Sequence, residues 1–177
     1  MGGIRQPKPV LLFIGMLVAD LPILDEVSKS LEAKFGPIEL ASKLIDFNFT
    51  TYYEPELGMG LKRQFLGFRN LVPPEMLPEV KLWTNALEDS RRVAEKRLFN
   101  LDPGYLTPAR LVLASTKDFA HRLYLGHGIY GEVTLLFQKG KFESLPWTYP
   151  DYRSQEYQEF FLELRRLYMA QLKSLAG

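Results

Sequence analysis

The sequence lacks several residue types that common kinds of site require. It contains no cysteine, which excludes disulfides, thiolate metal ligands and cysteine nucleophiles. Only two histidines are present, so no metal site is predicted. The charge is nearly balanced, with 22 Lys and Arg residues against 21 Asp and Glu residues. The chain therefore has no overall attraction to nucleic acid or to an anionic membrane, and nucleic-acid binding is not expected.

Long hydrophobic runs are also missing. The strongest run near the start, Val10 to Ala19, is about half as long as a membrane-spanning helix and is followed at once by Asp20. It is typical of a buried strand. Because this run leads into helix-like sequence and not into a cleavage site, we predict a cytoplasmic protein with no membrane association.

The residues that are present support one globular domain over residues 1–177. Of these residues, 46% are hydrophobic and 13% aromatic, enough for a sizeable core. Apolar periodicity predicts strands at 10–19, 38–51, 61–68 and 109–115 and helices at 20–36, 73–97 and 154–177. Asp20 is the expected N-cap of the first helix and Ser154 that of the last. Two extended runs joined at Lys139-Gly140 predict a tight hairpin, with Val133, Leu135 and Phe137 on one face.

The order of these elements predicts an α/β (α+β) fold. It is a two-layer sandwich with a ferredoxin-like βαββαβ core, followed by a C-terminal hairpin and helix. A doubly wound sheet is the alternative, but a long second strand that leads by a loop into the third favours antiparallel pairing. Asp102-Pro103-Gly104 has the residues of a turn.

A glycine-rich segment, Gly126 to Val133, fits the pattern G-x-G-x-x-G-x-V of a nucleotide-covering loop. A dinucleotide-binding loop is followed by a helix, whereas strand-like sequence follows here. The kinase-like motifs elsewhere in the chain stand in the wrong order for a kinase. We therefore expect this segment to form a turn between strands and not to hold a triphosphate.

Polar side chains gather just after the predicted strand at 109–115. Lys117 and Arg122 are candidates to bind a phosphate or carboxylate, since Arg offers a planar fork of donors and Lys a point charge. His121 titrates near neutral pH and is the candidate general acid or base if the protein is an enzyme. The structural alternative is that Asp118 caps a helical turn and pairs with Arg122.

Aromatic side chains beside basic ones point to the same kind of site. Tyr52, Tyr105 and Tyr149 are candidate ligand-binding residues, because an aromatic wall next to a basic edge suits a planar ring. Trp147 instead suits a lid over the core. We expect Tyr105, Lys117, His121, Arg122 and at least one of Tyr52 and Tyr149 to line a common concavity.

Segments along almost the entire chain resemble one family. They are "LFIGML", "FNFTTYYEPELG", "LKRQFLGF", "LDPGYLTPARLVLASTKDFAHRLYLGHGIYGEVTLLFQKGKF" and "LPWTYPDYR". The family is an uncharacterised prokaryotic one, domain of unknown function 4416, whose members are sometimes labelled GTP-binding in genomes. The resemblance implies no activity and no catalytic residues. The chain has no G-x-x-x-x-G-K-[ST] loop, and "STKD" matches the guanine-binding N-K-x-D motif only in Lys117-Asp118.

Two functions of different classes follow. The first is a site for a small anionic or nucleotide-like ligand, built from the aromatic and basic residues above. The alternative is a non-enzymatic interaction domain that binds a protein or RNA partner through an exposed sheet edge or aromatic surface. The sequence specifies no cofactor, reaction or oligomeric state.

Overall fold

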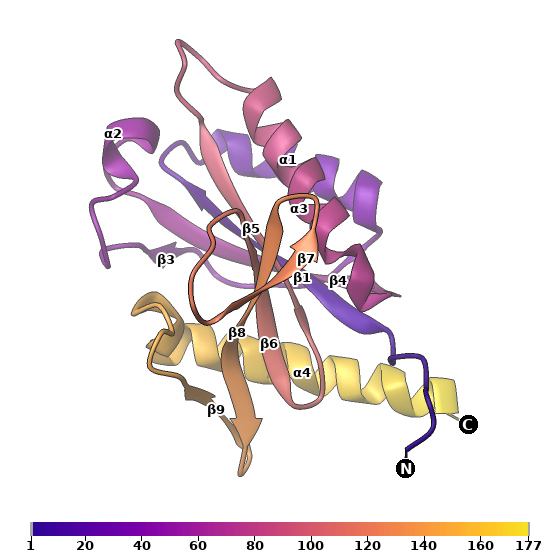
Figure 1. The fold of residues 1–177 in the computed structure, drawn as a ribbon. Coiled ribbons are helices and arrows are strands. Elements are labelled where there is room, and N and C mark those ends of the chain that lie inside the picture. The colour runs from indigo at the N-terminus through magenta and orange to yellow at the C-terminus, as the bar shows by residue number, and fades with distance from the viewer. Residues whose placement is uncertain (1, 177) are drawn as a thin grey trace.

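The computed structural model describes residues 2–176 and has one antiparallel sheet with helices on both faces (Figure 1). The mixed α/β class is confirmed. The strands are β1 (Val10–Val18), β2 (Ile38–Ala41), β3 (Ile45–Asp46), β4 (Lys62–Val72), β5 (Phe99–Leu106), β6 (Arg110–Ser115), β7 (Arg122–Gly126), β8 (Ile129–Gln138) and β9 (Lys141–Ser144). The helices are α1 (Pro22–Phe35), α2 (Glu54–Leu57), α3 (Leu77–Ser90) and α4 (Gln155–Ala176). Short 3-10 turns cover Pro74–Met76 and Asp151–Arg153.

The strand order is β2-β4-β1-β5-β6-β8-β7, with β3 paired to β4 and β9 to β8. Every pair is antiparallel, as the sequence indicated. Helix α1 connects β1 to β2, which lie on either side of β4. Helix α3 connects β4 to β5, which lie on either side of β1. Among the described residues, no helix combines the length and the apolar character that crossing a bilayer requires.

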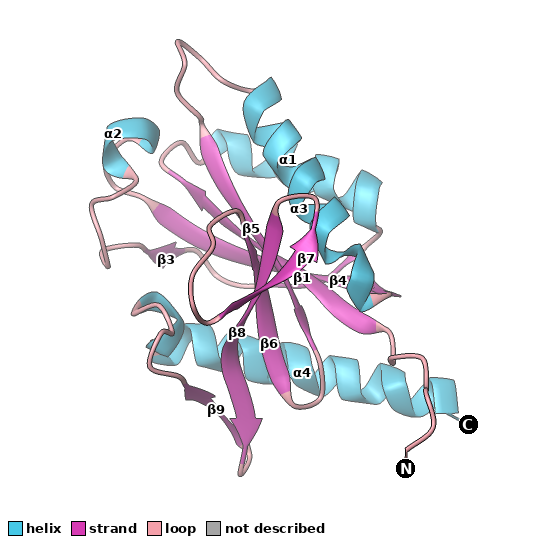
Figure 2. Cartoon of the chain, viewed as in Figure 1, coloured by secondary structure: helices cyan, strands magenta, loops and turns pink. Residues whose placement is uncertain are grey.

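The sheet is covered on both faces, which corrects the expected two-layer arrangement. Helix α4 lies on one face of the sheet, and α1 and α3 lie on the other (Figure 2). Leu11 and Phe13 of β1 pack with α4, and Leu12 and Ile14 pack with α1 and α3. All nine residues of β1 are buried, and a strand buried on both faces needs a cover on each. Helix α4 supplies the second cover.

Two expectations near the start of the chain were wrong. The strand expected at 38–51 is divided into β2 and the two-residue β3, and residues 47–53 form a loop with a turn at Tyr52-Tyr53. Strand pairing with β4 ends at Asp46, and beyond it the Phe47 N–H donates to the Leu61 carbonyl oxygen at 2.9 Å. Asp20 is not an N-cap: α1 begins at Pro22, with Leu21 at the cap position and no side-chain hydrogen bond.

Helix α3 has two buried faces. Leu77 and Val80 are buried on its apolar face. The second face is polar, at helical spacing: Lys81, Thr84 and Glu88 are 8%, 0% and 3% exposed. This buried polar face of α3 points to a site.

The hairpins follow the glycine pattern. Lys139 and Gly140 have φ values of 49° and 82°, and His127 and Gly128 have values of 55° and 74°, as tight two-residue turns require. The first turn joins β8 to β9 and the second joins β7 to β8, so both turns are as expected. Val133 does not share a face with Leu135, because the register of β8 against β6 shifts between these residues.

Pro103 and Gly104 do not form a turn, contrary to expectation; they lie inside β5. Strand β5 pairs with β1 over its full length, but with β6 only from Gly104 to Leu106. Proline has no N–H to donate to a neighbouring strand, so the ladder to β6 can end at this point without losing a bond. On the N-terminal side of Gly104, from Phe99 to Pro103, β5 is no longer paired with β6.

Replacing Gly104 with alanine is expected to lower the free energy of unfolding by roughly 1–3 kcal/mol. A Cβ at this position would lie 2.5 Å from the Val112 carbonyl oxygen and 2.6 Å from Phe13 Cζ. Urea unfolding measures the loss. Gly3→Ala is the control, since its Cβ would meet nothing within 4 Å. Equal stability of the two variants would contradict the close approach of these strands.

Candidate functional site

A cavity of about 910 Å³ lies where β5 and β6 separate. Its lining comes from the ends of these two strands, the polar face of α3, residues 47–56 and residues 149–152. Ligand cavities commonly have volumes of about 300–1,000 Å³. The cavity is therefore large enough for a nucleotide-sized molecule.

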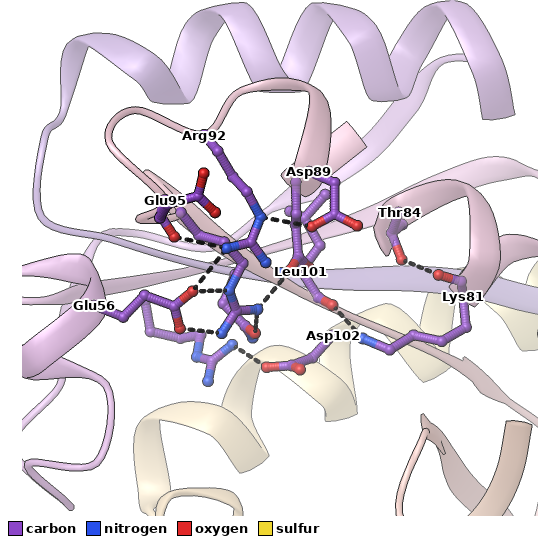
Figure 3. A network of polar contacts seen from close by, with 12 residues as sticks. Glu56, Lys81, Thr84, Asp89, Arg92, Glu95, Leu101 and Asp102 are labelled. Atoms are coloured by element: carbon purple, nitrogen blue, oxygen red, sulfur yellow. Dashed lines mark hydrogen bonds and ion pairs between the residues drawn. The ribbon is translucent and has the colours of Figure 1, made fainter. Parts of the chain in front are cut away.

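Helix α3 satisfies the backbone of β5 that β6 leaves unpaired (Figure 3). Lys81 Nζ donates a hydrogen bond to the Leu101 carbonyl oxygen at 2.8 Å. The Leu101 N–H donates to Glu88 Oε1 at 2.7 Å. Because buried backbone groups need partners, these contacts explain why α3 has a second, polar face.

Arg97 joins α2 to α3 beside the cavity. Its guanidinium donates to both carboxylate oxygens of Glu56 at 2.7 Å and to Glu88 Oε2 at 2.6 Å. The hydrogen bond from Arg97 lowers the pKa of Glu56. Burial raises the pKa of Glu88, and Lys81 and Arg97 offset only part of that rise. These ion pairs fix the position of α2 at the edge of the cavity.

The floor of the cavity is formed by Arg63, Lys81 and Asp102. Arg63 is 2% exposed; its Nη1 lies 2.9 Å from Asp102 Oδ2 and its Nη2 lies 3.8 Å from Asp151 Oδ2. Burial alone would raise the pKa of Asp102, but Arg63 and Lys81 outweigh it and the pKa is lowered. Burial raises the pKa of Asp151, and Arg63 does not fully offset it. Asp102 is therefore ionised, while Asp151 binds a proton more readily.

Ion pairs engage most of the charged groups in the cavity. Equal numbers of basic and acidic side chains line it, namely Arg63, Lys81, Arg92, Arg97, Lys117 and Arg122 with Glu56, Glu88, Asp89, Asp102, Glu132 and Asp151. Every one of these carboxylates lies within ion-pair distance of an arginine. Lys81 and Lys117 form no ion pair with any residue in 2–176. They are the cations with capacity left for a ligand.

Most of the predicted site residues meet in this cavity. Tyr52, Lys117, Arg122 and Tyr149 line it. The Lys117 ammonium lies 5.0 Å from the centre of the Tyr52 ring, which is a cation–π contact at the mouth. Tyr105 does not join them: it lines a separate cavity of about 240 Å³. The expected common concavity therefore excludes Tyr105.

Arg122 is engaged by protein groups on all sides. Its guanidinium donates to Glu132 Oε2 at 2.8 Å, Ser115 Oγ at 2.7 Å, the Lys117 carbonyl oxygen at 2.9 Å and the Tyr149 hydroxyl at 2.7 Å. Its side chain is 2% exposed. Arg122 thus positions the segments at the mouth of the cavity.

His121 lies outside the residues that line the cavity. Its Nε2 is 3.0 Å from Glu132 Oε2, and its ring stacks on Trp147 at 5.1 Å and on Phe119 at 6.0 Å. Trp147 therefore covers His121. The expected ion pair between Asp118 and Arg122 does not form, because Arg122 binds Glu132 instead. His121 does not line the cavity, but it contacts Glu132, which does.

Sequence reasoning missed the floor and the buried acid beside it. Asp102 was assigned to a turn, and Arg63 was not chosen as a site residue. Glu132 carried a signal, because it is the one acid in a strand of otherwise uncharged residues. Lys81 and Glu88 also carried one, since residues seven apart share a helix face.

A family model described as Domain of unknown function (DUF4416) matches residues 8–168. The chain belongs to this family. All of the residues that line the large cavity fall within the matched range. No curated protein and no solved structure matches the chain.

Proposed function

We propose that the large cavity of this DUF4416 domain binds a small molecule that has an anionic group and a planar ring. The observation that carries the proposal is the pair of unpaired lysines in a cavity whose carboxylates are all engaged by arginines. Lys81 is 8% exposed and its ammonium donates a single hydrogen bond, to Leu101. A buried ammonium with unused donors favours an oxygen of a ligand.

The mouth of the cavity supports the ring. We define the rim as Phe49, Tyr52, Phe119 and Tyr149, which line the cavity and are between 41% and 66% exposed. Aromatic side chains that border a cavity offer faces and edges on which a planar ring packs. Lys117 lies among them and adds a positive charge.

Lys81→Met and Lys117→Met are expected to weaken ligand binding by about tenfold or more, since a hydrogen bond to a charged group contributes about 1.5–3 kcal/mol. A thermal-shift screen with nucleotides, phosphorylated sugars and aromatic carboxylates identifies the ligand, because a molecule that binds the folded state raises Tm. Lys29→Met, an exposed change on α1, is the matched control. A screen with no shift, or equal shifts in all three variants, would contradict the proposal.

The edge of the sheet favours a second function, the addition of a strand from a partner protein. Strand β7 is the last in the sheet, and Leu123, Tyr124 and Leu125 are 73%, 64% and 41% exposed. An unpaired edge with exposed apolar side chains is typical of strand addition. Hydrogen exchange tests this: a partner that pairs with β7 slows exchange of its outward-facing amides, whereas a ligand of the cavity leaves them unchanged.

A further inference from the structure

We infer that the ligand of the cavity is a nucleoside monophosphate that binds without a divalent cation. This inference rests on the proposed function and adds to it the number of phosphate groups, the presence of hydroxyl groups and the independence from metal. Three features of the cavity carry it: its balance of charge, the state of its carboxylates and the partial exposure of the Asp102 carboxylate.

The balance of charge limits the charge of the ligand. Basic and acidic side chains line the cavity in equal number, so it has no excess of positive charge to offset a triphosphate. The local exception is the unpaired Lys81 on the floor. One ammonium group with unused donors suits one phosphoryl group, which carries roughly −1.5 to −2 charges at neutral pH.

The carboxylates argue against a nucleotide that arrives with magnesium. Proteins bind a magnesium–nucleotide complex through one or two carboxylates together with the phosphates. In this cavity Asp102 is paired with Arg63, and Glu56 and Glu88 are paired with Arg97. A metal would have to share a carboxylate with an arginine, whose positive charge repels it. Lys81 instead offsets the charge of the phosphate directly.

The exposed part of Asp102 favours a hydroxylated ligand. Its side chain is 26% exposed in a cavity where Arg63 binds Oδ2, and the neighbouring Asn100 amide also contacts the carboxylate. An ionised carboxylate accepts hydrogen bonds and cannot donate them. The exposed part of this carboxylate can accept a donor that lies next to the phosphate, as the hydroxyl groups of a ribose do. The base then lies at the rim, beside Tyr52 and Lys117.

Calorimetric titration of the full chain tests the inference with the four common ribonucleoside monophosphates. At least one is expected to bind about tenfold or more tightly than its nucleoside, which lacks the phosphate, and than its triphosphate with magnesium. EDTA leaves this affinity unchanged. Lys81→Met lowers the affinity for the monophosphate to that for the nucleoside, and Lys29→Met does not.

The hydroxyl contact has its own test in the unaltered protein. The 2′-deoxy or the 3′-deoxy form of the bound monophosphate is expected to bind about tenfold less tightly, because the Asp102 carboxylate loses a donor. Equal binding of all three forms overturns the assignment of the sugar to Asp102.

Other results separate this inference from the proposed function. Tighter binding of a triphosphate in magnesium, or monophosphate binding that Lys81→Met leaves intact, overturns the inference and leaves a ring-bearing anion in the cavity. So does binding of aromatic carboxylates with no binding of nucleotides. A flat response to every ring-bearing anion overturns both.

Discussion

Replacing Arg63 with methionine is expected to lower the free energy of unfolding at neutral pH by about 3–5 kcal/mol. The guanidinium lies between Asp102 and Asp151 and is 2% exposed. Removal leaves an ionised Asp102 on the floor of the cavity with Lys81 as its remaining cationic neighbour. Urea unfolding measures the change, and exposed Arg166→Met is the control, because an exposed ion pair contributes about 0–1 kcal/mol.

The loss caused by Arg63→Met is expected to depend on pH. The pKa of Asp102 is lower in the folded chain than in the unfolded chain, so this group stabilises the fold fully above its unfolded pKa. That contribution is lost as the pH falls through the folded pKa. The variant lacks most of it, so the two proteins begin to converge in stability only below about pH 4, as the pH falls toward the folded pKa. A loss of the same size at pH 7 and at about pH 2 would contradict the charge pairing.

Replacing Arg122 with methionine is expected to lower the free energy of unfolding by about 3–5 kcal/mol at neutral pH. Glu132 is 1% exposed, and without Arg122 it keeps hydrogen bonds to His121 and Thr134 alone. The Tyr149 hydroxyl also loses its donor, so part of the rim loosens.

A double-mutant cycle separates the charge pair from the lost packing. Adding Glu132→Met to Arg122→Met removes the buried charge and is expected to restore part of the stability. Each variant is unfolded in urea at pH 7. If Glu132→Met lowers the stability equally with and without Arg122, the two residues do not act as a pair.

Local patterns in the sequence predicted the elements whose form depends on local chemistry. The apolar run at Val10–Val18, the amphipathic helix after Ser154 and the turn at Lys139-Gly140 are examples. Ser154 Oγ accepts a hydrogen bond from the Tyr157 N–H, as its capping role requires. Residues just after a buried strand were also recognised, and Lys117 was among them.

The rest depends on contacts between distant segments. Asp102-Pro103-Gly104 has the chemistry of a turn, and the pairing of the whole segment with β1 keeps it extended. From the sequence alone, Lys81 on the polar face of α3 would be expected to face solvent. In the structure it donates a hydrogen bond to Leu101, in the part of β5 that does not pair with β6. The floor of the cavity combines β4, α3 and β5, so no single stretch of sequence contains it.

The separation of β5 from β6 gives the cavity a floor on regular elements and a rim on loops, and these two parts affect ligand binding differently. The floor groups lie on paired strands and on α3, which are already ordered before a ligand arrives, so they bind it without a cost of ordering. The rim residues lie on loops, at 47–53, 116–121 and 147–150. Loop motions are the faster and larger ones in a folded domain. Movement of the rim therefore speeds or slows ligand entry and release together, whereas the floor groups change the affinity and, with it, the rate of release.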